Sequence, residues 1–217
     1  MMLPSKERVA GVVLAGGQGR RMGGEPKVLM HLDGIRLVDH ALRRAMPQVG
    51  ALCLSSHLDA VRLGDPPCVV LRDRAPGFLG PLAGICSAME HFRGSAPHVQ
   101  WLCSFAADTP WFPLDLVERL LHALVQGGGA DMAVACSAGR RHPVFALWPM
   151  SALPGLQATL AEGTDLSLGR FQSALRPATA EWVVDGVDPF FNLNTPEDLE
   201  HARALAAGGG DSAPRFQ

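Results

Sequence analysis

The sequence predicts an α/β protein, namely a single three-layer α/β/α domain with a mostly parallel, Rossmann-like sheet. Short apolar segments of strand length alternate with segments of helical length along most of the 217 residues, which is typical of a parallel sheet covered by helices. Glycines or carboxylates directly follow several apolar segments, as they do at the ligand-binding edge of such a sheet. The chain has no internal repeat and no linker-like stretch. We therefore expect one domain at residues 1–207 and a disordered tail at residues 208–217.

The elements before residue 50 begin with the first strand. In chain order we expect a strand at 9–14, a glycine-rich loop at 16–26, a hairpin of 28–31 with 35–37, and a helix at 37–45. The strand is a continuous apolar run, which is the pattern of a strand buried on both faces. Asp33-Gly34 is a turn signal of the hairpin kind, and Pro47 ends the helix.

The middle of the chain continues the alternation. In chain order we expect strands at 51–54 and 68–71, a helix at 82–92, a strand at 99–105 and a helix at 114–125. The last of these helices has the clearest amphipathic pattern, because its apolar residues from Val117 onward recur at i, i+3, i+4, i+7 and i+8. Glycines at 127–129 end it.

The C-terminal third contains the remaining elements. We expect strands at 132–136 and 143–147, helices at 153–161 and 166–175, a short last strand at 182–184 and a helix from 195 to about 206. Thr195-Pro-Glu-Asp198 is a typical helix start, with Thr as the N-cap, Pro in the first turn and an acid three residues after the cap.

Composition excludes several classes of protein. The net charge of −2 and the pI near 6.4 do not favour a general nucleic-acid or membrane-surface binder. The five cysteines are scattered and form no Cys-x-x-Cys pair, which argues against a disulfide framework and a structural zinc site. No apolar run approaches the length of a membrane span. We expect a cytoplasmic protein without nucleic-acid or membrane partners.

The loop after the first strand is the strongest functional signal. Glycines let the backbone approach a ligand closely, and free N–H groups with nearby cations attract anions. A Walker A loop ends in Gly-Lys-Ser/Thr, whereas Lys27 lies between Pro26 and Val28 here. The dinucleotide fingerprint fails as well, because the sixth position counted from Gly17 is Met22. A third kind of loop remains, in which amides, arginine and lysine together hold a nucleoside triphosphate.

The whole stretch, Leu14-Ala-Gly-Gly-Gln-Gly-Arg-Arg-Met-Gly-Gly-Glu-Pro-Lys27, resembles the signature of sugar-nucleotide-like nucleotidyltransferases. Within that superfamily the chain is most similar to molybdenum cofactor guanylyltransferases, from residue 9 to about residue 205. The other matching motifs are Gly80-Pro-Leu-Ala-Gly84, Asp108-Thr-Pro110, Arg141-His-Pro-Val-Phe-Ala-Leu147 and Asn192-Leu-Asn-Thr-Pro-Glu-Asp-Leu199. The chain departs from the family pattern at Pro26, where an acid is common, and at Ala106-Ala107, where Pro-Cys is common.

The resemblance implies transfer of GMP from GTP to the terminal phosphate of molybdopterin, with Mg²⁺ as cofactor and pyrophosphate as leaving group. GTP and molybdopterin would be the substrates, and the proteins that insert the cofactor or load molybdenum would be partners. Two enzymatic alternatives stay open: a molybdopterin cytidylyltransferase, and a nucleotidyltransferase that acts on another phosphorylated metabolite. A nucleotide- or pterin-binding chaperone without catalysis is the alternative from a different class.

The choice of base depends on Gly16 in this interpretation. Relatives that use CTP typically have Leu-Ala-Ala-Gly where this chain has Leu-Ala-Gly-Gly at 14–17. By resemblance, the missing methyl group makes room for a larger base, which favours guanine.

Asp108 is the candidate metal ligand. It follows an apolar strand, and a carboxylate there suits Mg²⁺, although a turn or N-cap aspartate is an equal alternative from position alone. By resemblance, the catalytic residues are Arg21, Lys27 and Asp108. The residues implied for nucleotide binding are Leu14, Ala15, Gly16, Gly17, Gly19, Lys27, Ser55, Asp73, Gly80, Pro81, Leu82 and Asp108. Those implied for the molybdopterin side are His142, Asn192 and Asn194, with Arg140 and Arg141 as candidates for its phosphate.

Overall fold

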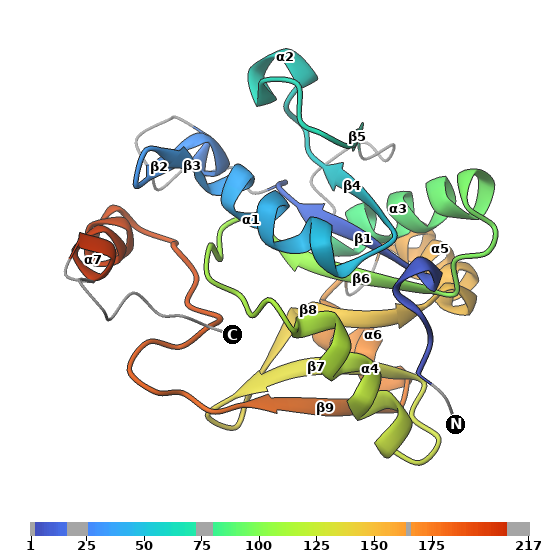
Figure 1. The fold of residues 1–217 in the computed structure, drawn as a ribbon. Coiled ribbons are helices and arrows are strands. Elements are labelled where there is room, and N and C mark those ends of the chain that lie inside the picture. Colours follow the sequence, from blue (N-terminus) through green and yellow to red (C-terminus); the bar gives the residue numbers. More distant parts are fainter. Residues whose placement is uncertain (1–2, 17–25, 73–79, 164–165, 208–217) are drawn as a thin grey trace.

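The computed structural model describes residues 3–16, 26–72, 80–163 and 166–207 (Figure 1). The strands of its main sheet are β1 (Val9–Leu14), β4 (Ala51–Ser55), β5 (Val69–Leu71), β6 (Trp101–Ala106), β7 (Met132–Ser137), β8 (Arg140–Pro149) and β9 (Pro177–Trp182). They form one seven-stranded sheet in the order β5-β4-β1-β6-β8-β7-β9. The predicted fold class, a mostly parallel sheet flanked by helices, is confirmed.

One strand of this sheet runs against the others. β1 pairs in parallel with β4 and β6, β4 with β5, and β7 with β9, whereas β8 is antiparallel to both β6 and β7. β7 and β8 are joined through Ala138 and Gly139, whose φ angles are both positive, 47° and 72°, as in a type I′ hairpin. The start of β8 therefore lies at the same edge of the sheet as the carboxyl ends of β1 and β6.

Helices cover both faces of the sheet. One face carries α1 (Leu37–Ala45) and α4 (Leu116–Gln126), and the other carries α3 (Pro81–Ser95), α5 (Leu153–Glu162) and α6 (Leu168–Ala174) (Figure 1). Phe105 is fully buried in the core of the first face and Trp148 in that of the second. Because the central strands are buried on both faces, their apolar runs do not alternate with polar residues.

Helix α3 packs closely on the ends of β1 and β4 because Gly84 faces them. A Cβ at Gly84 would lie 2.6 Å from Oγ of Ser55 and 2.7 Å from Cδ2 of Leu14. These distances are too short for a real Cβ contact, so with a larger residue either these two side chains or the helix would have to shift. The absence of a side chain at Gly84 thus allows α3 to lie close to the two strand ends.

A smaller unit lies beside α1. Its strands β2 (His31–Leu32) and β3 (Ile35–Arg36) pair antiparallel, and α7 (Pro196–Ala207) packs on them (Figure 1). The buried apolar side chains of this unit are Leu32, Leu37, Leu193, Leu199 and Ala202. Nη2 of Arg203 also donates a hydrogen bond to the backbone oxygen of His31, at 3.0 Å. The packing brings the segment before α7 close to the segment before β2.

The predicted last strand at 182–184 is wrong. β9 ends at Trp182, and Val183, which the prediction included, is 87% exposed. β9 is an edge strand of the sheet, and buried residues alternate with exposed ones only in its second half. An edge strand of this kind lacks the continuous apolar run by which the central strands were identified.

Two smaller differences concern local turns. Lys27–Leu29 forms a 3₁₀ helix, η2, and the strand β2 is His31–Leu32, so only His31 of the predicted segment 28–31 pairs as a strand. The single helical turn α2 (Ala60–Leu63) was not predicted; it is capped by Asp59, whose Oδ1 accepts a hydrogen bond from N–H of Arg62 at 2.8 Å. Both elements are too short to show an apolar period.

No helix in the described part of the chain is both long and apolar enough to cross a membrane. The five cysteines are free thiols, of which all but Cys68 are buried. Burial raises the pKa of Cys68 and of Cys86 to about 11, so these thiols stay protonated at neutral pH. They are packing residues of the core.

Candidate active site

The carboxyl ends of β1, β4 and β6 form the edge where the predicted nucleotide residues gather. Leu14 pairs with Ser55 on one side and with Ala106 on the other. Past the strand end, N–H of Ala15 donates to the backbone oxygen of Ser55 at 2.8 Å. The chain places β4 and β5 on one side of β1 and then β6 on the other. This is a topological switch point, where open α/β sheets bind ligands.

The start of α3 borders the same edge. Gly80 precedes the helix with φ of 71°, which favours glycine over other residues, and Pro81 occupies the first turn, where its missing N–H costs nothing. The side chain of Leu82 is fully buried in the core. Only the backbone of Leu82 is therefore available to a ligand. Free N–H groups at a helix start attract anions.

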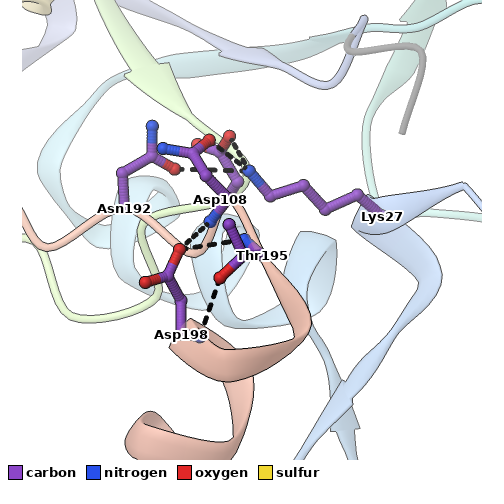
Figure 2. A network of polar contacts seen from close by, with 6 residues as sticks. Lys27, Asp108, Asn192, Thr195 and Asp198 are labelled. Atoms are coloured by element: carbon purple, nitrogen blue, oxygen red, sulfur yellow. Dashed lines mark hydrogen bonds and ion pairs between the residues drawn. The ribbon is translucent and has the colours of Figure 1, made fainter. Parts of the chain in front are cut away.

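Lys27 and Asp108 form an ion pair at this edge. Nζ of Lys27 lies 2.7 Å from Oδ2 of Asp108, and the side chains are 10% and 26% exposed. Lys27 belongs to η2, and Asp108 follows the end of β6. Figure 2 shows the ammonium group of Lys27 pointing toward Asp108 from the opposite side of the cluster. Two segments that are 81 residues apart in the sequence thus meet in one charged contact.

Two asparagine amides complete the coordination of the Lys27 ammonium group. It donates to Oδ1 of Asn194 at 2.9 Å and lies 3.5 Å from Oδ1 of Asn192. The backbone of the same segment is also tied to Asp108, whose carbonyl oxygen accepts N–H of Leu193 at 2.9 Å. The four predicted residues Lys27, Asp108, Asn192 and Asn194 therefore lie in one cluster.

The start of α7 fixes the asparagine segment. Oδ2 of Asp198 accepts N–H of Asn194 at 2.8 Å and N–H of Thr195 at 2.9 Å, and Oγ1 of Thr195 accepts N–H of Asp198 at 3.1 Å (Figure 2). This is a capping box with aspartate in the acidic position. Burial alone would raise the pKa of Asp198, but these hydrogen bonds lower it below its ordinary value.

A cavity of about 440 Å³ adjoins the cluster. It is lined by backbone and side chains from the end of β6, the start of β8 and the segment before α7, including Arg140, Arg141, His142, Phe190, Asn192 and Asn194. The two arginines are exposed at the start of β8. The cavity therefore shares its asparagine wall with the Lys27–Asp108 pair and has cationic groups at its other side.

The described residues offer oxygen ligands rather than a preformed metal cage. They hold no group of three or more His, Cys, Asp and Glu side chains that would bind a metal ion. Mg²⁺ usually takes one or two carboxylates and completes its shell with phosphate and water. The partly exposed carboxylate of Asp108 fits that kind of site, and the nearby amide oxygens of Asn192 and Asn194 are compatible with a hard cation.

Four predicted site residues, Gly17, Gly19, Arg21 and Asp73, lie outside the described residues. Sequence reasoning missed Ser137, which contacts His142, and Asp188, which accepts hydrogen bonds from Ser137. A serine at the end of one strand and an aspartate some 50 positions later have no local pattern. The sequence feature that could have indicated this part of the site is the aromatic pair Phe190-Phe191 directly before Asn192, because Phe190 lines the cavity.

Comparison with known proteins identifies the family of the chain. A family model described as a MobA-like NTP transferase domain matches residues 11–179. Molybdenum cofactor guanylyltransferase of Rhodopseudomonas palustris (strain HaA2) is 41% identical over 195 residues, which is 90% of this chain and 91% of that protein. The protein of the same name from Mesorhizobium japonicum is 42% identical over 200 residues, 91% of this chain and 95% of that protein.

A solved structure has the same fold. Molybdopterin-guanine dinucleotide biosynthesis protein A from Archaeoglobus fulgidus superposes with a TM-score of 0.70 at 24% identity, over 92% of this chain and 99% of that one. The likeness in fold extends across nearly the whole of both chains. With the family model and the two relatives, it leads to one assignment: the chain is a nucleotidyltransferase and belongs to the molybdenum cofactor guanylyltransferase family, among the MobA-like NTP transferases.

Proposed function

We propose that this enzyme transfers GMP from GTP to the terminal phosphate of molybdopterin and so makes molybdopterin guanine dinucleotide. The observation that carries the proposal is the cluster of Lys27, Asp108, Asn192 and Asn194, which lies between the switch point of the sheet and a cavity with cationic residues. A triphosphate on one side and a phosphorylated acceptor on the other would meet at this cluster. The names of the relatives support the same reaction.

The triphosphate would bind at the ends of β1 and α3. N–H of Ala15 is already bonded to the backbone oxygen of Ser55, so we assign the phosphate contacts to the backbone N–H groups of Gly16 and of the start of α3. The side chain of Lys27 would supply a positive charge. We assign further phosphate contacts to Gly17, Gly19 and Arg21 from their place in the motif. Ser55 and Asp73 stay proposed contacts of the nucleoside.

The chemical step is an in-line displacement. An oxygen of the acceptor phosphate forms a bond to the α-phosphorus of GTP, the bond from that phosphorus to the bridging oxygen breaks, and its electron pair leaves with pyrophosphate. Catalysis of such a step consists mainly of positioning and neutralisation of charge. Lys27 and the backbone amides supply both to the triphosphate, while Arg140 and Arg141 would attract the acceptor phosphate.

Nucleotidyltransferases of this family generally use a divalent metal, and we propose Mg²⁺ held by Asp108. Bound there with the triphosphate, it would neutralise charge on the phosphates. Oδ2 of Asp108 is paired with Lys27 in this structure. A metal held by that oxygen would replace the contact and make the ammonium group available to the phosphates.

Gly16 stays our candidate for the choice of base. A Cβ at Gly16 would lie 3.9 Å from the ring of His57, its nearest neighbour among the described residues. This is an ordinary contact, so the described protein would accommodate alanine. The absence of a side chain would therefore matter to the ligand rather than to the packing, in line with guanine as the larger base. The cytoplasmic location and the cofactor-handling protein partners stay predictions.

The decisive experiment incubates purified protein with molybdopterin and Mg²⁺ and supplies GTP, CTP, ATP or UTP separately. Pyrophosphate and the dinucleotide product are measured together. We expect the highest kcat/KM with GTP. A preference for CTP would mean that the enzyme is a cytidylyltransferase. Product that forms only when another phosphorylated metabolite replaces molybdopterin would mean that the proposed acceptor is wrong. GTP binding without pyrophosphate release would favour a non-catalytic chaperone.

A further inference from the structure

A second polar network links three segments at the wall of the cavity. Ser137 ends β7, His142 lies in β8, and Asp188 lies between β9 and α7. Oγ of Ser137 lies 2.7 Å from Nε2 of His142 and 2.9 Å from each carboxylate oxygen of Asp188. Ser137 itself is fully buried. The serine hydroxyl therefore connects the imidazole of His142 with the carboxylate of Asp188, and both residues line the cavity.

The hydrogen-bond inventory of these groups determines where the protons lie. A serine hydroxyl has a single hydrogen, and a carboxylate only accepts. Since Oγ lies equally close to both oxygens of Asp188, Ser137 donates to that carboxylate and must accept from His142. Oδ1 of Asp188 accepts a second hydrogen bond from N–H of Phe190, at 2.8 Å. Nε2 of His142 therefore carries a hydrogen.

The imidazole ring is held in this orientation from its face as well as from its edge. It stacks on the ring of Phe190 with centroids 4.5 Å apart and an interplanar angle of 24°. Turning the ring would exchange the donor for a carbon atom at Ser137 and leave the buried hydroxyl without its hydrogen bond, which costs free energy. One rotamer and one tautomer are therefore favoured together.

His142 is neutral at physiological pH in this environment. Burial lowers its pKa below the ordinary value, against the opposing influence of Asp188 and Glu181; the charge of Arg140 lowers it further. With Nε2 protonated, a neutral ring has its lone pair on Nδ1. Nδ1 makes no hydrogen bond to the described part of the chain, and the residue lines the cavity. Nδ1 is thus the ring nitrogen available to a ligand.

We propose that His142 binds the second substrate by accepting a hydrogen bond at Nδ1, and that Ser137 and Asp188 are positioning residues that hold the ring in the required tautomer. The proposal rests on the proposed function and adds that the second substrate must donate a hydrogen bond to Nδ1 of His142. The matching ligand is a planar heterocycle with N–H groups at its edge, joined to a phosphate that reaches Arg140 or Arg141. A pterin phosphate has this chemistry, whereas GTP, bound at the other side of the cluster, does not contact His142.

Substitution of His142 by asparagine and by glutamine distinguishes the role of Nδ1 from that of Nε2. The amide of asparagine lies at the level of Nδ1 and that of glutamine at the level of Nε2. We expect His142→Gln to raise KM for molybdopterin about tenfold, the effect of one hydrogen bond, while His142→Asn with an acceptor at the δ position raises it less. KM for GTP should stay unchanged in both. The opposite order would mean that His142 only anchors Ser137, and would overturn the proposal.

Proton positions are tested without activity. The ¹⁵N chemical shifts of His142 in the full-length protein distinguish the two neutral tautomers, and we expect the hydrogen on Nε2. In Ser137→Ala we expect a mixture of tautomers and a higher KM for molybdopterin with an unchanged KM for GTP. A hydrogen on Nδ1 in the unmodified protein would overturn the proposal.

The pH profile provides a third readout. KM for molybdopterin should rise as pH falls through the lowered pKa of His142, because protonation removes the lone pair of Nδ1. The substrate phosphate titrates near the same pH, so His142→Asn serves as the control that retains only the substrate's own titration. Identical profiles would contradict the inference. Failure of the proposed function is distinct, because the unmodified protein would then form no dinucleotide at all.

Discussion

Nζ of Lys27 and Oδ2 of Asp108 are 2.7 Å apart at the carboxyl edge of the sheet, and each charge compensates the other. Lys27 reaches this contact from η2 and Asp108 from the end of β6. Both side chains are largely buried, and a buried charge without a partner is costly. The pair therefore keeps the two charges compensated in this structure, and in the proposed function phosphate and metal would replace the mutual contact. Two predictions test the two halves of this exchange.

Asp108→Asn preserves the size of the side chain and an oxygen acceptor for Lys27, but removes the negative charge. We expect pyrophosphate release to fall about 100-fold or more, because a neutral amide is a poor ligand for Mg²⁺ and stabilises no charge in the transition state. GTP binding measured by calorimetry without metal should change little. Asp131→Asn is the matched control, since Asp131 pairs with Arg176 before β7, at the opposite edge of the sheet. Full activity of Asp108→Asn would exclude it as metal ligand.

Lys27→Met retains much of the buried apolar stem and removes the ammonium group. We expect KM for GTP to rise and kcat to fall, with a combined loss in kcat/KM of about 10- to 100-fold, the usual effect of a lost hydrogen bond to a charged group. Steady-state kinetics measures both constants. Arg176→Met removes a cation from the exposed pair with Asp131 and should leave both constants unchanged. If Lys27→Met matched that control, Lys27 would have only a structural role.

Thr195→Ala tests whether the cap of α7 positions the asparagine amides. Loss of the capping hydroxyl should lower the free energy of unfolding by about 1 kcal/mol and reduce turnover as well, because Asp198 also holds N–H of Asn194. Denaturant unfolding and kcat are measured on the same preparation. Asp59→Ala removes the cap of the exposed turn α2 and should affect stability without affecting turnover. Equal turnover in the two variants would mean that the cap of α7 does not position the asparagine amides for catalysis.

Asp198 should make this region sensitive to acid. Its pKa is lower in the folded protein than the value of 3.8 that an unperturbed aspartate has. The stabilisation is therefore complete above pH 3.8 and is lost as pH falls through the lowered pKa of the folded state, because the unfolded chain then binds the proton more readily. The stability difference between the unmodified protein and Asp198→Asn should shrink in that range. A difference that is independent of pH would contradict the assignment of the charge.

The sequence predicts the central elements because each has a pattern of its own. β1 is a continuous apolar run, and α4 has an apolar stripe with helical spacing. The position of β9 was predicted wrongly because an edge strand that is buried on one side has neither a continuous apolar run nor an apolar stripe with helical spacing. The candidate residues were found by their motifs, but their contacts were not predictable, since Lys27 meets Asn194 from 167 positions away. That contact depends on the docking of α7 on β2.

The network of Ser137, His142 and Asp188 shows a second limit. His142 was predicted to lie near the site, yet nothing in the local sequence indicates which residue would contact its ring. Ser137 contacts it across the hairpin turn, five positions away in the sequence. Asp188, in the segment between β9 and α7, contacts Ser137 from 51 positions away. A serine and an aspartate on separate segments have no spacing that would distinguish them from surface residues. Tertiary contacts alone give them a role.

Gly84→Ala tests whether the close approach of α3 is needed for nucleotide binding. The added Cβ would lie 2.6 Å from Oγ of Ser55 and 2.7 Å from Cδ2 of Leu14. Overpacking of this kind typically costs about 1–3 kcal/mol. The helix start, with its free N–H groups, would also move away from the end of β1. We therefore expect lower stability together with weaker GTP binding, measured by urea unfolding and calorimetry.

Gly94→Ala is the matched control in the same helix. A Cβ at Gly94 meets nothing within 4 Å among the described atoms, and alanine has a better helix propensity than glycine by up to about 1 kcal/mol. This variant should be equally or more stable and should bind GTP unchanged. If Gly84→Ala behaved in the same way, the side chains of Leu14 and Ser55 would have room to move aside. The spacing between α3 and the strand ends would then not control the nucleotide site.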